Sequence, residues 1–557
     1  MKKLMKKKNN LLLISDFNSQ SFAEILNEKI YQHSFKVKNA SYNQVYLNLK
    51  KYKNNLNYSY SIIWTHPERI NINFSKAFNL NEINEKSCLD EVDHFSNEVI
   101  NFAKGKIVFL SLWGLDKNEK GYGINDWKSN LGLRNLLAKM NIRLCDRLKK
   151  FNNIYVLDFE KLKLNFNDVS FPKMWYATKI PYTDEYFIKV TEEIENSILS
   201  IQGKNKKIIL LDLDNTIWGG VVGETGWKGI RLGGHDHIGE AYVDFQKKIK
   251  SLTNAGIQIG IVSKNDEKVA LEVFKKHPEM ILSINDIAGW RINWKDKSHN
   301  VEELLNELNL GKSSAVFIDD NPVEREAIKI AHKDILVPEL PSDPCLYRNF
   351  LNNLDCFNFA SISNEDRKRK KMYIDERVRR SIKNNSNNEN DWLKKIDTKI
   401  KCKSLNEINF SRTLQLINKT NQLNLTTRRF TAVELKKWLE KKNNFMMTIE
   451  ASDAFGEMGI VGILGLSTSG NIGIITDYVM SCRIMGRKVE DTLIFLAAKK
   501  FKSLKLNTMR AVLKPTKRNR PTIDVFKNSI MVEKTKNNFI LKNLDINPPT
   551  KFIKITF

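Results

Sequence analysis

The feature that most constrains the fold is an alternation of short apolar runs with longer helical stretches, from about residue 11 to residue 360. The first runs are LLLIS, YSIIW, KIVFLSLW and NIYVLDF, and helical stretches such as NLLAKMNIRLCDRLKKF accompany them. From residue 208 the pattern recurs with KIILLDLD, IQIGIVSKN, MILSIND, AVFIDDNP and DILVPEL. Strand–helix alternation predicts parallel sheets covered by helices, so we expect two successive α/β domains. The β-rich segments after residue 400 predict a further α+β domain.

Length and composition indicate a multidomain globular protein. The chain has 557 residues, too many for one core, and its 41% hydrophobic content argues against general disorder. No apolar run is long enough for a membrane span, and the run behind the basic start MKKLMKKKNN is too short for a secretory signal. The six cysteines form no CxxC pair, which is typical of a reduced protein without a zinc knuckle. We therefore expect a cytoplasmic location.

The formal net charge of +26 predicts an anionic partner. The excess is mostly lysine, and no stripe of arginine interleaved with aromatic residues appears, as a nucleic-acid module would need. We expect no nucleic-acid partner. An acidic protein or a phosphorylated substrate explains the charge at least as well.

Four aspartates follow two of the predicted strands. Asp212 and Asp214 come after IILL, at the carboxyl end of a strand, where open α/β sheets bind ligands. Asp319 and Asp320 follow AVFI. Such crowded carboxylates are costly without a cation, and a partly hydrated Mg²⁺ suits their oxygen ligands. Aspartates after a strand can also merely cap a helix, so the first pair alone leaves both interpretations open.

Two further polar residues stand between these pairs. Ser263 ends the strand IQIGIV, where its hydroxyl and nearby backbone N–H groups are suited to hold phosphate. Lys297, in NWKDKSHN, is suited to balance phosphate and aspartate charge, with Lys295 as a competitor. Nucleophilic Asp, acid/base Asp, hydroxyl, lysine and metal carboxylate are what covalent phosphoryl transfer requires.

This ordered set resembles the haloacid dehalogenase (HAD) superfamily. The resemblance implies that Asp212 attacks phosphorus, and that Asp214 protonates the leaving group and then activates water. It also implies a Mg²⁺ cofactor held by Asp212, by Asp214 through its carbonyl, and by Asp319, with Asp320 as the alternate ligand.

A closer resemblance is to the FkbH-like branch (subfamily IIIC) over residues 208–380. It rests on DLDNTIWGGVVGE, AYVDFQKKIKSLTNAGI, SKNDE, HPEM, NWKDKSHN and FIDDNPVERE, and it places Lys297 at the lysine position. Trp218 either shapes the substrate pocket or packs as a buried aromatic. The substrate-binding residues implied are Thr216, Gly219, Gly220 and Asn265.

The N-terminal segment resembles the SGNH-hydrolase-like region that precedes the HAD domain in this family. A working enzyme of that type needs Gly-Asp-Ser early and Asp-x-x-His near its end. Here the opening is ISDFNSQSF, and none of the eight histidines lies between residues 94 and 235. Triad chemistry is not expected, so we predict a binding or docking domain.

The C-terminal segment resembles a GNAT-like acyltransferase, on NQLNLTTRRF, DAFGEMGIVG, SCRIMGRKVED and KPTKRNRP. Acetyltransferases bind the pyrophosphate of coenzyme A with R/Q-x-x-G-x-G/A at a helix N-terminus. Arg483 and Gly486 fit this motif, whereas Lys488 occupies the last small-residue position. The resemblance implies that Arg483, Gly486 and Arg487 bind a phosphopantetheine phosphate.

Cys482 has two open interpretations. It precedes a predicted helix N-terminus beside Arg483, which lowers a thiol pKa and suits a covalent acyl thioester. It is equally compatible with a buried cysteine that acts as a small apolar residue.

The predicted organisation is a sequence of four segments. They are an SGNH-hydrolase-like domain at 1–203, a HAD-like domain at 204–361, a charged helix and linker at 362–400, and a GNAT-like domain at 401–557. The resemblance implies that the chain dephosphorylates a three-carbon acyl phosphate like 1,3-bisphosphoglycerate and loads the glyceryl unit onto an acyl carrier protein thiol. The alternatives are a stand-alone Mg²⁺-dependent small-molecule phosphatase and a carrier-protein-binding scaffold in polysaccharide or polyketide-like biosynthesis.

Overall fold

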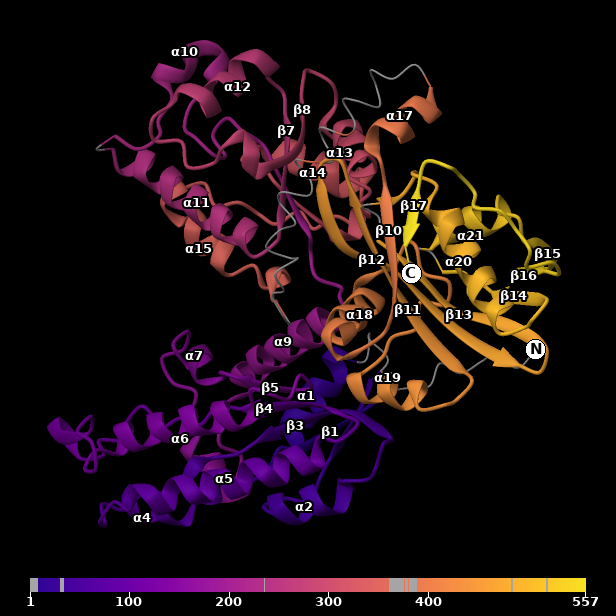
Figure 1. The fold of residues 1–557 in the computed structure, drawn as a ribbon. Coiled ribbons are helices and arrows are strands. Elements are labelled where there is room, and N and C mark those ends of the chain that lie inside the picture. The colour runs from indigo at the N-terminus through magenta and orange to yellow at the C-terminus, as the bar shows by residue number, and fades with distance from the viewer. Residues whose placement is uncertain are drawn as a thin grey trace. The chain divides into compact units, whose positions relative to one another are not determined.

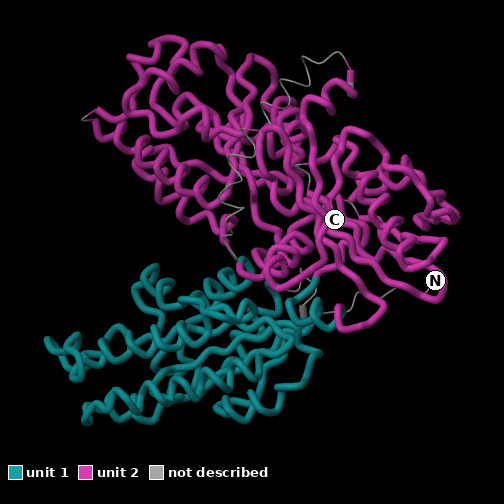
Figure 2. Tube along the Cα trace, viewed as in Figure 1, with its two compact units in different colours: residues 1–196, 430–438 teal, residues 197–429, 439–557 magenta. Residues whose placement is uncertain are grey.

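The computed structural model describes residues 9–30, 35–234, 236–359, 375, 379, 388–481, 484–516 and 519–556. The chain divides into two compact units, residues 1–196 with 430–438 and residues 197–429 with 439–557 (Figure 2). Most of the predicted charged helix and linker at 362–400 lies outside the described residues.

The first sheet has five parallel strands in the order β2-β1-β3-β4-β5 (Figure 1). Its strands are β1 (Asn9–Ser15), β2 (Phe35–Asn39), β3 (Tyr58–Trp64), β4 (Ile107–Ser111) and β5 (Ile154–Leu157). The helices of this segment are α1 (Gln20–Ile30), α2 (Val45–Tyr52), α3 (Pro67–Ile70), α4 (Ile72–Phe78), α5 (Glu85–Phe102), η2 (Gly123–Asn125), α6 (Leu133–Leu148), α7 (Glu160–Lys163), α8 (Pro172–Thr178) and α9 (Asp184–Ile201). Leu12 and Ile14 of β1 share one apolar cluster with residues of α5 and α6. Strands β1 and β4 are nearly continuous apolar runs, as expected of strands covered by helices, whereas the edge strand β2 reads FKVKN.

The second sheet has four parallel strands in the order β8-β7-β6-β9. Its strands are β6 (Ile208–Leu211), β7 (Gln258–Ser263), β8 (Ile287–Ile292) and β9 (Ala315–Ile318). Its helices are α10 (Val222–Gly229), α11 (His237–Asn254), α12 (Glu267–Lys276), η3 (Ile284–Asp286), α13 (Lys297–Glu307), η4 (Lys312–Ser314), α14 (Pro322–Ala331), η5 (Pro344–Leu346), α15 (Tyr347–Asn352) and η6 (Asp355–Phe357). Central strand β6 is buried on both faces: Ile209 packs in a cluster with residues of α11, and Leu210 in another with residues of α13.

Two predicted strands of this segment are placed differently. MILSIND is not a strand. Its last three residues form η3, and β8 begins only at the next residue, Ile287. DILVPEL contributes only an isolated bridge between Leu336 and Val316 of β9. The other predicted runs form strands, and the predicted multidomain α/β class is confirmed.

The third sheet has eight strands in the order β15-β16-β14-β13-β12-β11-β10-β17. They are β10 (Lys399–Ser404), β11 (Asn444–Asp453), β12 (Gly456–Ser469), β13 (Ile472–Met480), β14 (Thr508–Val512), β15 (Val532–Thr535), β16 (Asn538–Leu541) and β17 (Lys554–Thr556). The helices are α17 (Glu389–Ile396), α18 (Glu407–Lys419), α19 (Ala432–Leu439), α20 (Val489–Ser503) and α21 (Arg520–Lys527). The pairs β13/β14 and β10/β17 are parallel and the others are antiparallel. Gly473 of β13 makes room for Phe501 of α20, since a Cβ there would lie 2.4 Å from the ring.

None of the helices in the described part of the chain has both the length and the apolar character that a membrane span requires.

Candidate functional site

The four-stranded sheet brings three predicted residues to one edge. Asp212 follows β6, Ser263 ends β7 and Asp319 follows β9, and these parallel strands are neighbours. The Asp212 N–H donates to the Ile318 carbonyl at 3.0 Å, which fixes the loop after β6 beside the end of β9. One carboxylate oxygen from each of Asp212, Asp319 and Asp320 lies within 4.8 Å of the other two.

Lys297 is the cation of this cluster. It begins α13 behind the N-cap Asp296, and its Nζ lies 2.6 Å from Asp319 Oδ2 and 3.1 Å from Asp212 Oδ1. Burial lowers the pKa of Lys297, but the two carboxylates outweigh it and the net pKa is raised. The competing Lys295 is exposed. The structure therefore brings Lys297, and not Lys295, to the aspartates.

These carboxylates fit a divalent cation. Asp212 Oδ1 is buried, and although it is near Lys297 it has no well-oriented hydrogen bond in the described part of the chain. Burial and the nearby Asp212 charge raise the pKa of Asp319 to about 7. Oxygen ligands with excess negative charge are the set that Mg²⁺ prefers.

The two candidates for the third metal ligand differ in their partners. Asp319 uses both carboxylate oxygens, accepting from Lys297 and from the Asn321 N–H at 2.9 Å. Asp320 Oδ1 accepts from Thr216 Oγ1 at 3.3 Å, and the N–H of Asp320 also hydrogen-bonds its own carboxylate. Asp320, predicted as the alternate, therefore has no ion pair with a cation among the described residues, whereas Asp319 is already paired with Lys297.

The Asp214 carboxylate takes no part in this cluster. Its Oδ1 accepts from Trp218 Nε1 at 2.8 Å and from the Val222 N–H at 3.1 Å, and its Oδ2 accepts from Asn265 Nδ2 at 2.8 Å. Burial raises the pKa of Asp214, partly offset by these donors. Its predicted contact with the metal therefore rests on the backbone carbonyl alone. Trp218 is fully buried and stacks edge-on against Phe274, so it both packs and holds Asp214.

The predicted phosphate and substrate contacts fall into two groups. Ser263 is 2% exposed, and no hydrogen bond of its hydroxyl is found among the described residues. Gly220 has φ +89°, open space where a Cβ would stand, and an N–H that donates to Asn215 Oδ1 at 2.8 Å. Thr216 and Gly219 are more closely held within the chain: the Thr216 hydroxyl contacts Asp320, and Gly219 exchanges two backbone hydrogen bonds with Arg231.

The predicted phosphopantetheine site is only partly described, because Cys482 and Arg483 lie outside the described residues. The N–H of Gly486 donates to the side chain of Glu490, in the first turn of α20. Arg487 is buried, and its guanidinium donates to Asp453 Oδ2 at 3.1 Å. Of the groups predicted to bind phosphate, the two that the structure describes, Gly486 and Arg487, are thus bonded within the chain.

A segment of the chain also fills the space beside β13. Strands β13 and β14 pair from Ile472 opposite Thr508 to Ile475 opposite Ala511, where the pairing ends. Beyond that point, Leu425 N–H donates to the Tyr478 carbonyl at 3.0 Å, and Lys514 N–H donates to the Leu425 carbonyl at 3.0 Å. The segment 423–425 therefore continues the sheet between the diverging strands, and its side chains are buried.

The five-stranded sheet carries a polar network that the sequence prediction missed. His66 follows β3 closely, and its Nδ1 lies 2.9 Å from Asp16 Oδ1 while its Nε2 lies 3.0 Å from Tyr182 Oη. His66 lies just beyond the run YSIIW and belongs to no Asp-x-x-His pattern, so the motif does not point to it. The network is largely buried and its groups bond to one another, which indicates a structural role.

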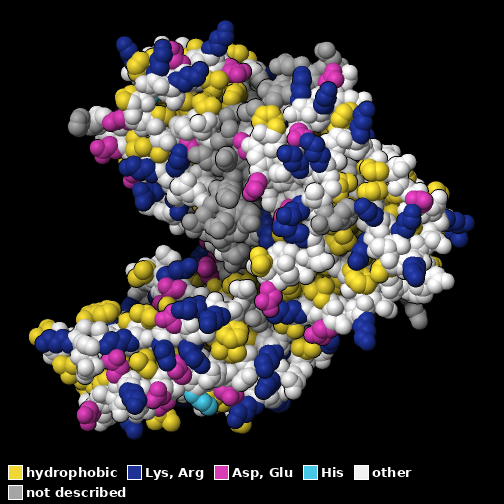
Figure 3. Space-filling model, in the orientation of Figure 1, with side chains coloured by type: hydrophobic (Ala, Val, Ile, Leu, Met, Phe, Trp, Pro, Cys, Tyr) yellow, Lys and Arg dark blue, Asp and Glu magenta, His cyan; other side chains and the backbone are white. Residues whose placement is uncertain are grey.

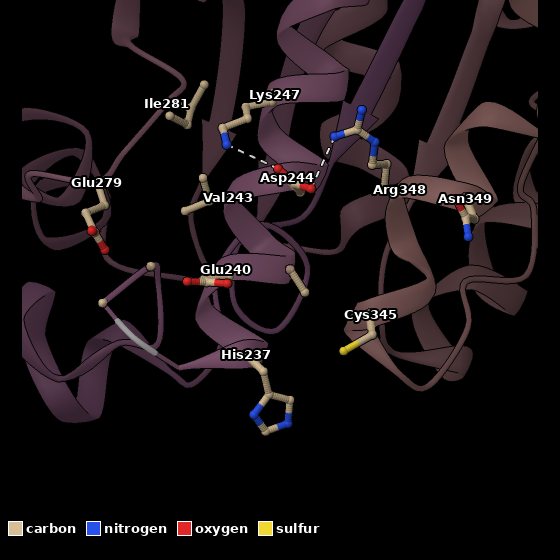
Figure 4. Close-up of a pocket in the computed structure, with 13 residues that line it drawn as sticks. His237, Glu240, Val243, Asp244, Lys247, Glu279, Ile281, Cys345, Arg348 and Asn349 are labelled. Carbon is tan, nitrogen blue, oxygen red and sulfur yellow. Dashed lines mark hydrogen bonds and ion pairs between the residues drawn. The ribbon is translucent and has the colours of Figure 1, made fainter.

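A cavity of about 750 Å³ lies beside α11 and η5 (Figure 4). Asp244 stands between Lys247 and Arg348, at 3.2 Å from each. Glu240 and Glu279 also line it. None of the predicted catalytic or metal-binding residues does, so this cavity is separate from the aspartate cluster.

No family model matches the chain, and no match was found among curated proteins. Among solved structures, the chain is similar to the N-terminal part of a Bacteroides fragilis protein containing a phosphatase domain, in complex with Mg. The two are 29% identical over 63% of this chain and 94% of that chain, with a TM-score of 0.58. Spermidine N-acetyltransferase from Vibrio cholerae matches 26% of this chain and 92% of its own, at 13% identity and a TM-score of 0.20. That second likeness is too weak to support a conclusion.

Proposed function

We propose that the chain is a HAD-type, Mg²⁺-dependent phosphatase with Asp212 as its nucleophile. The observation that carries the proposal is the cluster of Asp212, Asp319 and Asp320 around the buried Lys297 at the carboxyl edge of a parallel sheet. The similarity to a phosphatase-domain protein in complex with Mg supports it.

The residues divide the chemistry between them. Asp212, Asp320 and Asp319 would hold Mg²⁺, which when bound neutralises charge on the phosphate. Lys297 and the Ser263 hydroxyl bind the phosphate oxygens. Asp212 attacks phosphorus, and Asp214 gives a proton to the leaving oxygen.

The second step restores the enzyme. Asp214, now a carboxylate, takes a proton from a water molecule as that water attacks the phosphorus of the Asp212 phosphate. The bond between phosphorus and Asp212 breaks, inorganic phosphate leaves, and Asp214 is again protonated.

The substrate is proposed to be a three-carbon acyl phosphate like 1,3-bisphosphoglycerate. Asp212 would remove its 3-phosphate, an ester whose basic leaving oxygen takes the Asp214 proton. The phosphopantetheine thiolate of an acyl carrier protein would then attack the acyl carbon and displace the acyl phosphate as inorganic phosphate, which leaves the glyceryl unit on the carrier. This part rests on the FkbH-like motifs. The charge of +26 also favours encounter with an acidic carrier. Gly486 and Arg487 are already hydrogen-bonded within the chain, so they give no support to acyl transfer near the N-terminus of α20.

One experiment separates this proposal from its alternatives. The protein is incubated with Mg²⁺, 1,3-bisphosphoglycerate and a holo carrier protein, and both phosphate and carrier mass are measured. If the protein loads the carrier, the carrier should gain the mass of a glyceryl unit. Asp212→Asn should abolish this gain, and the exposed Asp334→Asn control should keep it. Phosphate release with an unchanged carrier favours the stand-alone phosphatase. Tight carrier binding without turnover favours the scaffold.

A further inference from the structure

We infer that Trp218 and Asn265 are positioning residues that hold the Asp214 carboxylate for proton transfer to the leaving group. This inference rests on the proposed phosphatase function and assigns Asn265 a role other than substrate contact. It concerns two residues that the phosphoryl-transfer steps themselves do not use.

The Asp214 side chain is held from three directions. Trp218 donates its indole N–H from four residues further along the loop, the Val222 N–H comes from the start of α10, and the Asn265 amide comes from the loop after β7. Trp218 is completely buried and Asn265 is 3% exposed, so water competes little for either bond. Asn265 is itself fixed, because its Oδ1 accepts from the Asp266 N–H at 3.0 Å.

The pattern of donors also fixes where the Asp214 proton resides. Oδ1 accepts two hydrogen bonds, which occupy both of its lone pairs. Oδ2 accepts only the one from Asn265. A protonated Asp214 therefore carries its proton on Oδ2, and Trp218 and Asn265 together determine where that proton points.

The proton transfer assisted by this arrangement is balanced within the proposed steps. As Asp212 forms its bond to phosphorus, the bond to the leaving oxygen breaks, and the Oδ2 proton moves to that oxygen. Substrates with a very stable leaving anion need no such proton, whereas substrates with a basic leaving oxygen depend on it.

The test compares two aryl phosphates that differ in leaving group. Trp218→Phe removes the indole donor and keeps an aromatic ring, and Asn265→Ala removes the amide. In each variant we expect kcat/KM for phenyl phosphate to fall by about 10²-fold, within the range of general-acid contributions, and that for 2,4-dinitrophenyl phosphate by less than about threefold. KM should change little, since the phosphate contacts remain.

Trp290→Phe is the matched control, because this indole in the same sheet donates to Glu267 at 3.0 Å, and it should alter neither substrate. Equal losses on both substrates in the two variants, or no loss on phenyl phosphate, would overturn the inference. If Trp218→Phe does not fold, Asn265→Ala decides. Activity that survives in Asp212→Asn would instead refute the proposed function, which keeps the two failures distinct.

Discussion

Lys297 is the only cation among the described residues that contacts both Asp212 and Asp319, and all three side chains are buried. Lys297→Met removes this cation and leaves the carboxylates uncompensated. We expect the free energy of unfolding in EDTA to fall by about 3–5 kcal/mol, as when one partner of a buried ion pair is lost. Mg²⁺ should recover part of the loss, because an ion that binds the folded state and not the unfolded state raises the free energy of unfolding.

The measurement is urea unfolding of both proteins in EDTA and in Mg²⁺. The exposed Lys295→Met serves as control and should match the unaltered chain in both. An equal loss for Lys297→Met with and without Mg²⁺ would count against a shared metal and lysine site.

His66 predicts a pH dependence in the five-stranded sheet. Burial lowers the pKa of His66, but Asp16 raises it by more, so the net pKa is above its usual value. A raised folded-state pKa adds stability that is complete below about pH 6.5 and is lost as pH rises through the folded-state value. The stability of the unaltered chain relative to His66→Gln should therefore shrink as the pH rises above neutrality.

Amide hydrogen exchange in β1 and β3 reports this stability locally. The exposed His94→Gln is the control and should show no such trend. If the stability difference between the unaltered chain and His66→Gln stays constant or grows as the pH rises, a charged pair of His66 with Asp16 is contradicted.

The sequence predicts which residues lie at strand ends, because this depends only on where an apolar run stops. Asp212 and Ser263 were assigned to strand ends because apolar runs end visibly before them, and the structure brings both to one edge. The bonds from Trp218 and Asn265 to Asp214 could not be predicted, since they depend on how α10 and the loop after β7 meet that side chain.

At the scale of elements, apolar patterns located most strands but not their limits. MILSIND is as apolar as a strand, yet η3 occupies its end, and the capping pair of Ser283 with Asp286 stops a strand there. Pairing between β13 and segment 423–425 was likewise not predicted, although QLNLT alternates polar and apolar residues as a short strand does.

The N-terminus of α20 supports a prediction about coenzyme A. Its Gly486 N–H already donates to Glu490, and Glu490 and Asp491 place two carboxylates where a diphosphate would have to bind. We expect any affinity of the chain for coenzyme A, measured by titration calorimetry, to be weaker than about 1 mM. Saturable tighter binding that protects residues 486–491 from hydrogen exchange would show that these groups can rearrange.

At the scale of the whole molecule, charge bears on partners rather than on fold. On the face drawn in Figure 3, Lys and Arg side chains are spread among acidic and apolar ones. The net charge of +26 favours encounter with anions in general. It is compatible with a phosphorylated substrate and with an acidic carrier.

The central claim is that Asp212 becomes phosphorylated. The most direct measurement mixes the protein with Mg²⁺ and 1,3-bisphosphoglycerate, quenches it during turnover, and reduces any acyl phosphate with borohydride. Mass spectrometry of the peptide spanning residues 208–228 should then find homoserine in place of Asp212, and none when Mg²⁺ is omitted. Steady phosphate release with Asp212 unmodified, or homoserine at Asp214 instead, would contradict the account.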